Sequence, residues 1–232
     1  MTQDSKFDLL YFPIKGRALT SQLLLSLAGA DWKNSVPEWP KDKEKMPYGR
    51  LPVLIETEED GSKFVLSESR AIEEYLAARF DLLPQGIKNL AVSSQYVNQI
   101  FDIVDAFVNI VSFKNKTSMV HGVDVDGLTK FPSECKDREQ FFIAQHIVNM
   151  IKILNDSVKY FLQKHDQILA NSQSGYYFGD SITYADLTLY SIYFGLKCEN
   201  LAAEFDSPNY PHINKLIQLV ASNSTVAAVI NK

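Results

Sequence analysis

Near the N-terminus the sequence reads Phe7-Asp8-Leu9-Leu10-Tyr11-Phe12-Pro13-Ile14-Lys15-Gly16-Arg17. The short apolar run at residues 7–11 is typical of a buried strand. From residue 16 to residue 30 the apolar side chains recur at the spacing of a helix with a broad apolar face. This segment therefore predicts a strand, a turn and a helix, with the phenol of Tyr11 at the end of the strand.

The next fifty residues alternate between strands and loops. Residues 31–36 form a candidate second strand, and the prolines at 37, 40 and 47 predict a loop with little regular structure. Residues 51–56 are predicted to form the next strand, and Glu58-Glu59-Asp60-Gly61 favours a hairpin turn. Residues 64–66 are the second strand of that hairpin. Residues 67–80 then have the pattern of a helix. The predicted order is strand, helix, strand, β-hairpin and helix.

Beyond a short linker at residues 81–86, which contains Pro84, the pattern is helical to the end. Long apolar helices are predicted at residues 97–111, 138–163 and 183–196. The composition thus changes near residue 85 from mixed α/β to all-α. We expect a first domain at residues 1–82 and an all-helical second domain at residues 86–232.

Composition excludes several classes of protein. The chain has 232 residues, of which 46% are hydrophobic and 22% charged, so a packed core is expected. A net charge of -5 argues against nucleic acid as a partner, and the apolar stretches are too short to span a membrane. The two cysteines, Cys135 and Cys198, and the polar first six residues favour a cytoplasmic protein with reduced thiols. The four histidines have no metal-ligand spacing, so no metal is expected.

Five motifs follow one another along the chain. They are Tyr11-Phe12 with Gly16-Arg17, Trp39-Pro40 with Lys43, Met46-Pro47-Tyr48-Gly49-Arg50-Leu51-Pro52-Val53-Leu54, Ser67-Glu68-Ser69 with Ala71-Ile72 and Tyr75-Leu76, and Gly179-Asp180-Ser181-Ile182-Thr183-Tyr184-Ala185-Asp186. In these motifs the chain resembles the cytosolic glutathione transferases, and among them the tyrosine-type sigma class. The resemblance implies a thioredoxin-like, glutathione-binding first domain and an all-helical second domain that forms much of the hydrophobic substrate site and of the dimer interface. It also implies glutathione as cosubstrate and a homodimer.

The resemblance implies that Tyr11 is catalytic. Its hydroxyl would donate a hydrogen bond to the sulfur of bound glutathione and favour the thiolate, because a free thiol titrates at about 8.5. Residues 12–16 contain neither Cys nor Ser, which disfavours the classes that use those residues. The alternative is a strand-end tyrosine that only packs on its neighbours.

Further contacts to glutathione are implied by the same motifs. Pro52 matches a cis-proline that lets the backbone of Leu51 bind an extended peptide. Ser69, at the start of a predicted helix, would bind the γ-glutamyl carboxylate, and Glu68 the amine; alternatively Ser67 or Ser69 is a plain N-cap. The complete implied set is Arg17, Trp39, Lys43, Arg50, Leu51, Pro52, Glu68 and Ser69. For Arg17 and Lys43 the alternative is a solvated surface charge.

The remaining expectations concern the second substrate and the partner subunit. Candidates for the hydrophobic substrate wall are Phe12, Ile14, Ile110 and Phe113, although an apolar stripe is usually core. Many relatives have an acidic residue where Asn109 falls, which leaves Asp105 as the candidate acid. Tyr48 is a candidate aromatic key to the partner subunit. Thr183 and Asp186 have capping-box spacing, which indicates a role in folding.

We therefore expect a glutathione transferase that conjugates glutathione to hydrophobic electrophiles in detoxification. One alternative is a glutathione-dependent peroxidase or isomerase on the same fold. The other is a non-enzymatic, ligand-binding or crystallin-like protein, which would not need Tyr11, Pro52, Glu68 and Ser69 together.

Overall fold

The first domain is built on a mixed four-stranded sheet. The computed structural model of the chain describes residues 5–121 and 138–232, without the side chains of 114–121 and 138–140. The strands are β1 (Lys6–Leu10), β2 (Asp31–Ser35), β3 (Val53–Thr57) and β4 (Lys63–Ser67). Their order is β2-β1-β3-β4, with β2 parallel to β1 and the other two pairs antiparallel. Strand β1 is therefore an inner strand, in agreement with its apolar sequence.

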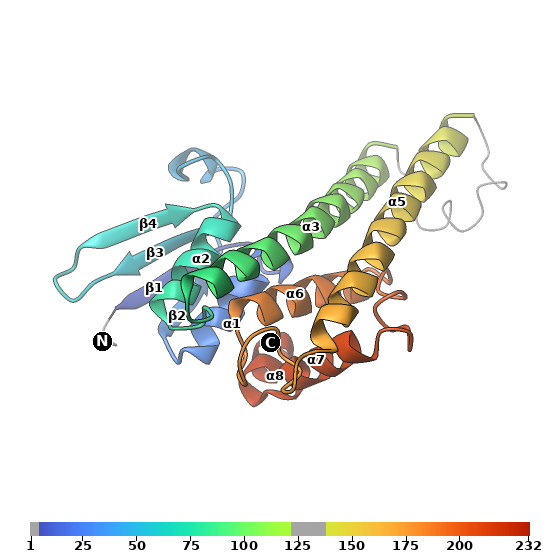
Figure 1. The fold of residues 1–232 in the computed structure, drawn as a ribbon. Coiled ribbons are helices and arrows are strands. Elements are labelled where there is room, and N and C mark those ends of the chain that lie inside the picture. The colour runs from blue at the N-terminus through green and yellow to red at the C-terminus, as the bar shows by residue number, and fades with distance from the viewer. Residues whose placement is uncertain (1–4, 122–137) are drawn as a thin grey trace.

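Two helices pack between this sheet and the rest of the chain (Figure 1). A short 3-10 turn, η1 (Gly16–Ala18), leads into α1 (Leu19–Leu27), and α2 (Ser69–Arg79) follows β4. Leu23 and Leu24 of α1 and Ile72 and Leu76 of α2 are completely buried. The sequence of strand, helix, strand, hairpin and helix confirms the predicted thioredoxin-like first domain.

The second domain contains only helices among its described residues. They are α3 (Ile87–His121), α5 (Arg138–Leu169), α6 (Tyr184–Cys198), α7 (Pro211–Ser222) and α8 (Ser224–Ile230). The two long helices α3 and α5 lie side by side, and α6 contacts α3, α7 and α1 (Figure 1). All three helices expected from the apolar pattern are present. Helix α3 begins at Ile87, ten residues before the predicted start at residue 97. The apolar pattern did not reveal its first turns, because they are more polar than the stretch that follows.

The start of α6 has the predicted capping box. Both the backbone N–H and the hydroxyl of Thr183 donate to Asp186, at 2.8 and 2.6 Å, and the backbone N–H of Tyr177 donates to the same carboxylate at 2.9 Å. Asp186 is completely buried. Burial outweighs these three hydrogen bonds and raises the pKa of Asp186 to about 6. The carboxylate ties the loop before α6 to the first turn of that helix.

The two domains are joined by buried polar contacts. The backbone N–H of Tyr184, at the start of α6, donates to the carbonyl of Leu82 at 2.8 Å. Its hydroxyl donates to Glu73 of α2 at 3.0 Å. Burial raises the pKa of Glu73 to about 8, so this side chain is mostly protonated at neutral pH. On α1, Thr20 donates to Ser191 of α6 at 2.9 Å. Helices α1 and α2 are thus fixed on α6 from the side away from the sheet.

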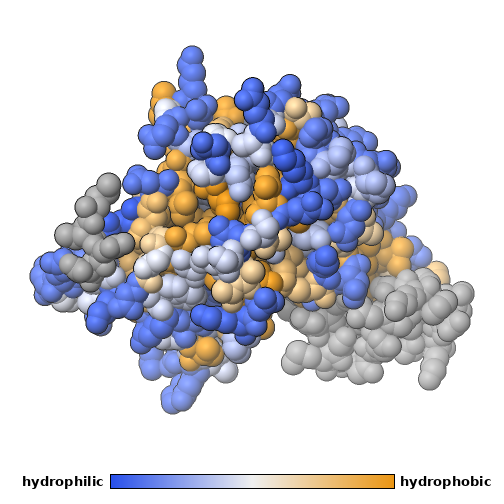
Figure 2. Space-filling view, turned by 90° about the horizontal axis from the view of Figure 1, so that it is seen from below, coloured by the Kyte–Doolittle hydropathy of each residue, from blue (hydrophilic) through white to orange (hydrophobic). Residues whose placement is uncertain are grey.

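The surface is mixed in character. Seen from below, apolar residues gather in the middle of one face and hydrophilic residues surround them (Figure 2). Within residues 5–121 and 138–232, no single helix is long and apolar enough to cross a membrane; α7 and α8 meet that test only as a pair, bent by 83°.

Candidate functional site

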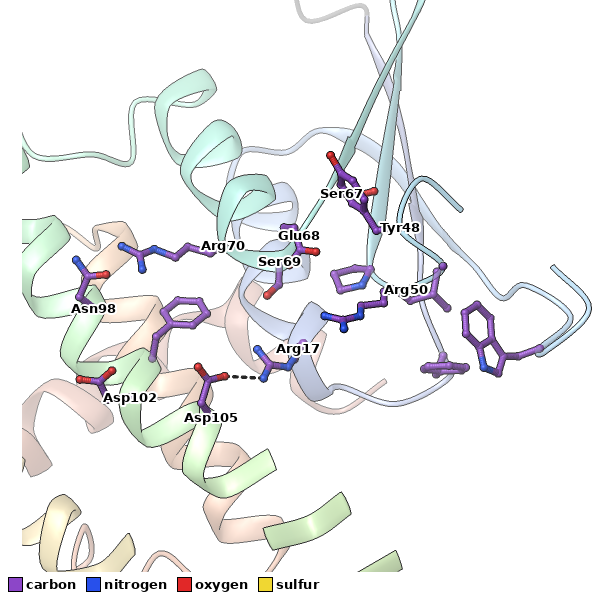
Figure 3. A pocket seen from close by; sticks show the side chains of 16 residues that line it. Arg17, Tyr48, Arg50, Ser67, Glu68, Ser69, Arg70, Asn98, Asp102 and Asp105 are labelled. Atoms are coloured by element: carbon purple, nitrogen blue, oxygen red, sulfur yellow. Dashed lines mark hydrogen bonds and ion pairs between the residues drawn. The ribbon is translucent and has the colours of Figure 1, made fainter. Parts of the chain in front are cut away.

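A cavity of about 660 Å³ opens where the two domains meet (Figure 3). The first domain supplies the turn after β1, the loop before β3 and the start of α2, and the second domain supplies one side of α3. The lining residues are Phe12, Arg17, Trp39, Tyr48, Gly49, Arg50, Leu51, Pro52, Ser67, Glu68, Ser69, Arg70, Asn98, Phe101, Asp102 and Asp105. Eight residues predicted to bind substrate are therefore brought together: Phe12, Arg17, Trp39, Arg50, Leu51, Pro52, Glu68 and Ser69.

Tyr11 lies directly after β1 and is 6% exposed; it is not itself among the lining residues, although its neighbour Phe12 is. Its hydroxyl oxygen accepts a hydrogen bond from the backbone N–H of Arg17 at 3.0 Å. Burial raises the pKa of Tyr11, so the hydroxyl keeps its proton at neutral pH. In the described part of the chain, no acceptor takes that proton. The phenol is thus held as a hydrogen-bond donor.

The turn after β1 closes tightly on this hydroxyl. Gly16 has a φ of +40°, which is left-handed backbone, and a Cβ at this position would lie 2.6 Å from the hydroxyl oxygen of Tyr11. Any side chain there would push the phenol away, because real Cβ atoms do not approach so closely. The glycine is needed both for the turn and for the approach.

Charged side chains line the floor of the cavity. Arg17 forms an ion pair with Asp105 of α3 at 2.7 Å, which crosses the domain boundary. Arg50 points toward Arg17 beside Ser69 (Figure 3), and it has no ion-pair partner within residues 5–121 and 138–232. Arg70 lies over the ring of Phe101 at 5.6 Å. The guanidinium groups of Arg17 and Arg50 face the same space, and such a pair favours an anion between them.

The start of α2 opens into the same cavity. Its N-cap is Glu68, whose φ is 72° and whose side chain makes no capping hydrogen bond. Neither Ser67 nor Ser69 is therefore the N-cap, because Ser69 is the first helical residue. The first N–H groups of a helix have no partner within the helix and carry partial positive charge. This end of α2 is suited to a carboxylate.

The loop before β3 has two cis peptide bonds, Leu51-Pro52 and Trp39-Pro40. The first confirms the expected cis-proline, and nothing in the sequence analysis predicted the second. Trp39 packs edge-on against Phe12, with ring centroids 5.6 Å apart. Lys43, in the short turn η2 (Lys43–Lys45), does not line the cavity. Its side chain lies beside Gly49, which does.

The apolar candidates are divided by the structure. Phe12 lines the cavity, and Ile14, on the same turn, is 60% exposed. Ile110 is 1% exposed and packs in the core, so it cannot touch a substrate in this arrangement. Phe113 packs on His146 of α5 with ring centroids 5.0 Å apart, away from the cavity lining.

Sequence reasoning named Asp105 of α3 but missed the rest of the face of that helix that lines the cavity. Asn98, Phe101, Asp102 and Asp105 lie there at helical spacing. A signal was present, because polar residues at 98, 102 and 105 interrupt an otherwise apolar helix on one side. In the described part of the chain no group of acidic, histidine or cysteine side chains could hold a metal ion.

Comparisons with known proteins agree with this architecture. The family described as "Glutathione S-transferase, N-terminal domain" matches residues 8–78, and "Glutathione S-transferase, C-terminal domain" matches residues 144–232. "Probable glutathione S-transferase 7" of Caenorhabditis elegans is 33% identical over 184 residues, which cover 76% of this chain and 73% of that protein. The chain belongs to the glutathione S-transferase family. It is a transferase, and its cosubstrate is glutathione.

Solved glutathione S-transferases have the same fold. A Nu-class enzyme from Haemonchus contortus has a TM-score of 0.67 at 28% identity and covers 98% of this chain and 97% of its own. A sigma-class enzyme from Fasciola hepatica has a TM-score of 0.72 and covers 98% of this chain and 96% of its own, but at 21% identity this likeness shows the fold alone. Membership of the sigma class is therefore not confirmed for this glutathione S-transferase.

Proposed function

We propose that this glutathione transferase binds glutathione in the cavity described above and uses Tyr11 to stabilise the thiolate. The observation that carries the proposal is the Tyr11 hydroxyl, which stays protonated and whose proton has no acceptor in the described part of the chain. A hydrogen bond to an anion is stronger than one to a neutral group, so this donor favours thiolate over thiol. The thiolate then attacks a hydrophobic electrophile, and the protein needs no nucleophile of its own.

The two carboxylates of glutathione have separate candidate sites. Ser69 and the open N–H groups of α2 suit the γ-glutamyl carboxylate, with Glu68 beside the amine. The backbone of Leu51, before its cis bond to Pro52, suits the central peptide. At the other end, Trp39 and Lys43 are the candidate partners of the glycyl carboxylate, and Arg17 and Arg50, whose side chains lie beside Ser69 (Figure 3), are further candidate contacts to glutathione.

The second substrate is proposed to lie against apolar residues on the turn after Tyr11 and on α3. Phe12 and Ile14 on the turn are the candidates from the first domain. Phe101, which sequence reasoning did not single out, replaces Ile110 as the candidate on α3, and Phe113 remains a candidate further along that helix. We also propose that the enzyme is cytoplasmic and belongs to a sigma-like, tyrosine-type class. Its glutathione-binding domain is proposed to span residues 1–82.

Replacing Ser69 by Ala tests the glutathione site. We expect the dissociation constant for glutathione to rise about tenfold or more, because one hydrogen bond to a charged group contributes about 1.5–3 kcal/mol. Turnover at saturating glutathione should change little. Titration calorimetry measures the first quantity and steady-state kinetics the second.

The matched control is Ser67→Ala on the neighbouring lining residue. The Ser67 hydroxyl is buried and has no hydrogen-bond partner in the described part of the chain. Unchanged binding in Ser69→Ala, or a larger loss in Ser67→Ala, would show that the carboxylate is bound elsewhere. Failure of the parent protein to be retained on immobilised glutathione would contradict the proposed site as a whole.

A homodimer is also proposed, on the evidence of exposed apolar side chains in the first domain. Tyr48, which lines the cavity, is 71% exposed, and Phe64 and Val65 of β4 are 41% and 48% exposed. Light scattering should give about twice the mass of one chain, and Tyr48→Ala should shift the protein toward monomer at low concentration. Tyr160→Ala is the control, because Tyr160 is 65% exposed on α5 in the other domain. A monomeric parent protein would contradict this part of the proposal.

A further inference from the structure

Lys15 connects the turn beside Tyr11 to the last helix of the chain. Its Nζ donates to the backbone carbonyl of Val229 at 2.6 Å, across 214 positions of sequence. Val229 lies in the last turn of α8, is 6% exposed and belongs to the core. Helix α8 in turn packs on α1, the helix that follows the turn. The active-site turn and the C-terminal helix are therefore in direct contact.

The contact satisfies a group that the helix itself leaves open. The last carbonyls of a helix have no partner within the helix, and the C-terminal end carries partial negative charge. A lysine that donates to such a carbonyl gains both a hydrogen bond and a favourable charge interaction. Burial lowers the pKa of Lys15, and so does the nearby charge of Lys232. The side chain is thus partly buried for this contact rather than solvated.

The backbone that follows Lys15 shapes the position of the phenol. Gly16 has no room for a side chain against the Tyr11 hydroxyl, and the N–H of Arg17 donates to that hydroxyl at 3.0 Å. The carbonyl of Lys15 accepts from the N–H of Ala18 at 3.1 Å, which closes the turn. A shift at Lys15 is passed through one residue to the groups that touch the phenol.

We infer that Lys15 is a positioning residue, which uses α8 as a fixed support to hold the turn, and with it the Tyr11 hydroxyl, in the place where it meets the glutathione sulfur. This inference rests on the proposed role of Tyr11. Lys15 acts through Gly16 and Arg17 and does not touch the substrate. The C-terminal helix is consequently part of the active-site support, although it contributes no residue to the lining of the cavity.

The test is the pKa of the bound glutathione thiol, measured from the ultraviolet absorbance of the thiolate as a function of pH. In Lys15→Met we expect the pKa of the bound thiol to rise by about half a unit. At a pH below this pKa, kcat should fall about threefold, since one pKa unit corresponds to about a tenfold change in the thiolate fraction. The KM for glutathione should stay within about twofold, because the carboxylate contacts are untouched. Lys15→Arg should restore the thiol pKa, because its guanidinium can donate to the same carbonyl.

The matched control is Lys197→Met. Lys197 donates to the Tyr193 hydroxyl at 2.8 Å near the end of α6. Within the described residues it makes no hydrogen bond or ion pair to the turn or to α8, so its loss should leave the thiol pKa unchanged. A double-mutant cycle with Val226→Ala, which loosens α8 at a completely buried residue, tests the helix. The shift caused by Val226→Ala should disappear in the Lys15→Met background.

Three results would overturn the inference. The first is an unchanged thiol pKa in Lys15→Met, and the second is an equal effect of Val226→Ala in both backgrounds. The third is an unchanged thiol pKa in Tyr11→Phe, which would refute the proposed role of Tyr11 and the positioning role with it. If Tyr11→Phe raises the pKa and Lys15→Met does not, the function stands and only the role of Lys15 fails.

Discussion

Replacing Tyr11 by Phe should reduce conjugation turnover at neutral pH about 10- to 100-fold while glutathione still binds. The change removes one hydroxyl and leaves the ring that packs against Phe12. A hydrogen bond to a charged group contributes about 1.5–3 kcal/mol, which corresponds to about one or two units in the pKa of the bound thiol. The thiol would then stay largely protonated at pH 7, and the attacking species would be scarce.

The sign of the pH dependence distinguishes this mechanism from a general loss of structure. Tyr11→Phe raises the thiol pKa, so the deficit in turnover should be largest below the parent's thiol pKa. It should shrink as the pH rises through the raised value, where the thiolate forms without help. A pH profile of kcat with an aryl halide or an isothiocyanate measures this.

Tyr190→Phe is the matched control for Tyr11→Phe. Tyr190 is also 6% exposed, and burial also raises its pKa, but it lies on α6, whereas Tyr11 directly precedes Phe12 of the cavity lining. Its replacement should leave the profile unchanged. A Tyr11→Phe deficit that is equal at every pH would argue against thiolate stabilisation as the role of the phenol.

Replacing Asp186 by Ala should lower the free energy of unfolding by about 3–5 kcal/mol, because two backbone N–H groups and one hydroxyl lose their buried acceptor together. These groups join the loop at Tyr177 to the first turn of α6, which contacts both domains. Urea unfolding followed by circular dichroism measures the loss. Asp180→Ala, at an exposed aspartate a few residues earlier, should change the stability by less than about 0.5 kcal/mol.

The raised pKa of Asp186 adds a dependence on pH. Burial raises this pKa from its ordinary value of 3.8 to about 6, so between these values the folded chain retains a proton that the unfolded chain releases. The contribution of this group to stability therefore falls as the pH rises from about 4 to about 6. This pH-dependent part of the free energy of unfolding should be absent in Asp186→Ala. A loss of stability as small as that of Asp180→Ala would show that the capping box is dispensable.

Much of the fold was predictable because local patterns determine it. The apolar run at residues 7–11, the Asp60-Gly61 turn and the periodic helices each follow from a few neighbouring residues. The cis bond at Pro52 and the capping box at Asp186 followed from motifs. The exact start of α2 was harder to predict. Its N-cap is Glu68, with a positive φ and no capping hydrogen bond from its side chain, rather than one of the neighbouring serines.

The candidate site was predictable only on the side formed by the first domain. Phe12, Trp39, Leu51 and Ser69 lie in motifs that are themselves loop or helix-terminal signals. Apart from Asp105, the α3 side was not predictable, because helical periodicity separates the faces of a helix and does not say which face a distant domain leaves exposed. Ile110 was assigned to the open face and lies in the core, whereas Phe101 was not assigned and lines the cavity.

The division of the cavity lining between the domains has a consequence for how such an enzyme can diversify. The groups suited to the tripeptide come almost entirely from the sheet, its loops and α2, whereas α3 supplies Asn98, Phe101, Asp102 and Asp105. The Arg17–Asp105 ion pair and the contact of Arg70 with the Phe101 ring join the two sets directly. Substitutions on α3 can therefore accumulate and change which electrophiles are accepted, while the half that recognises the common cosubstrate is inherited intact.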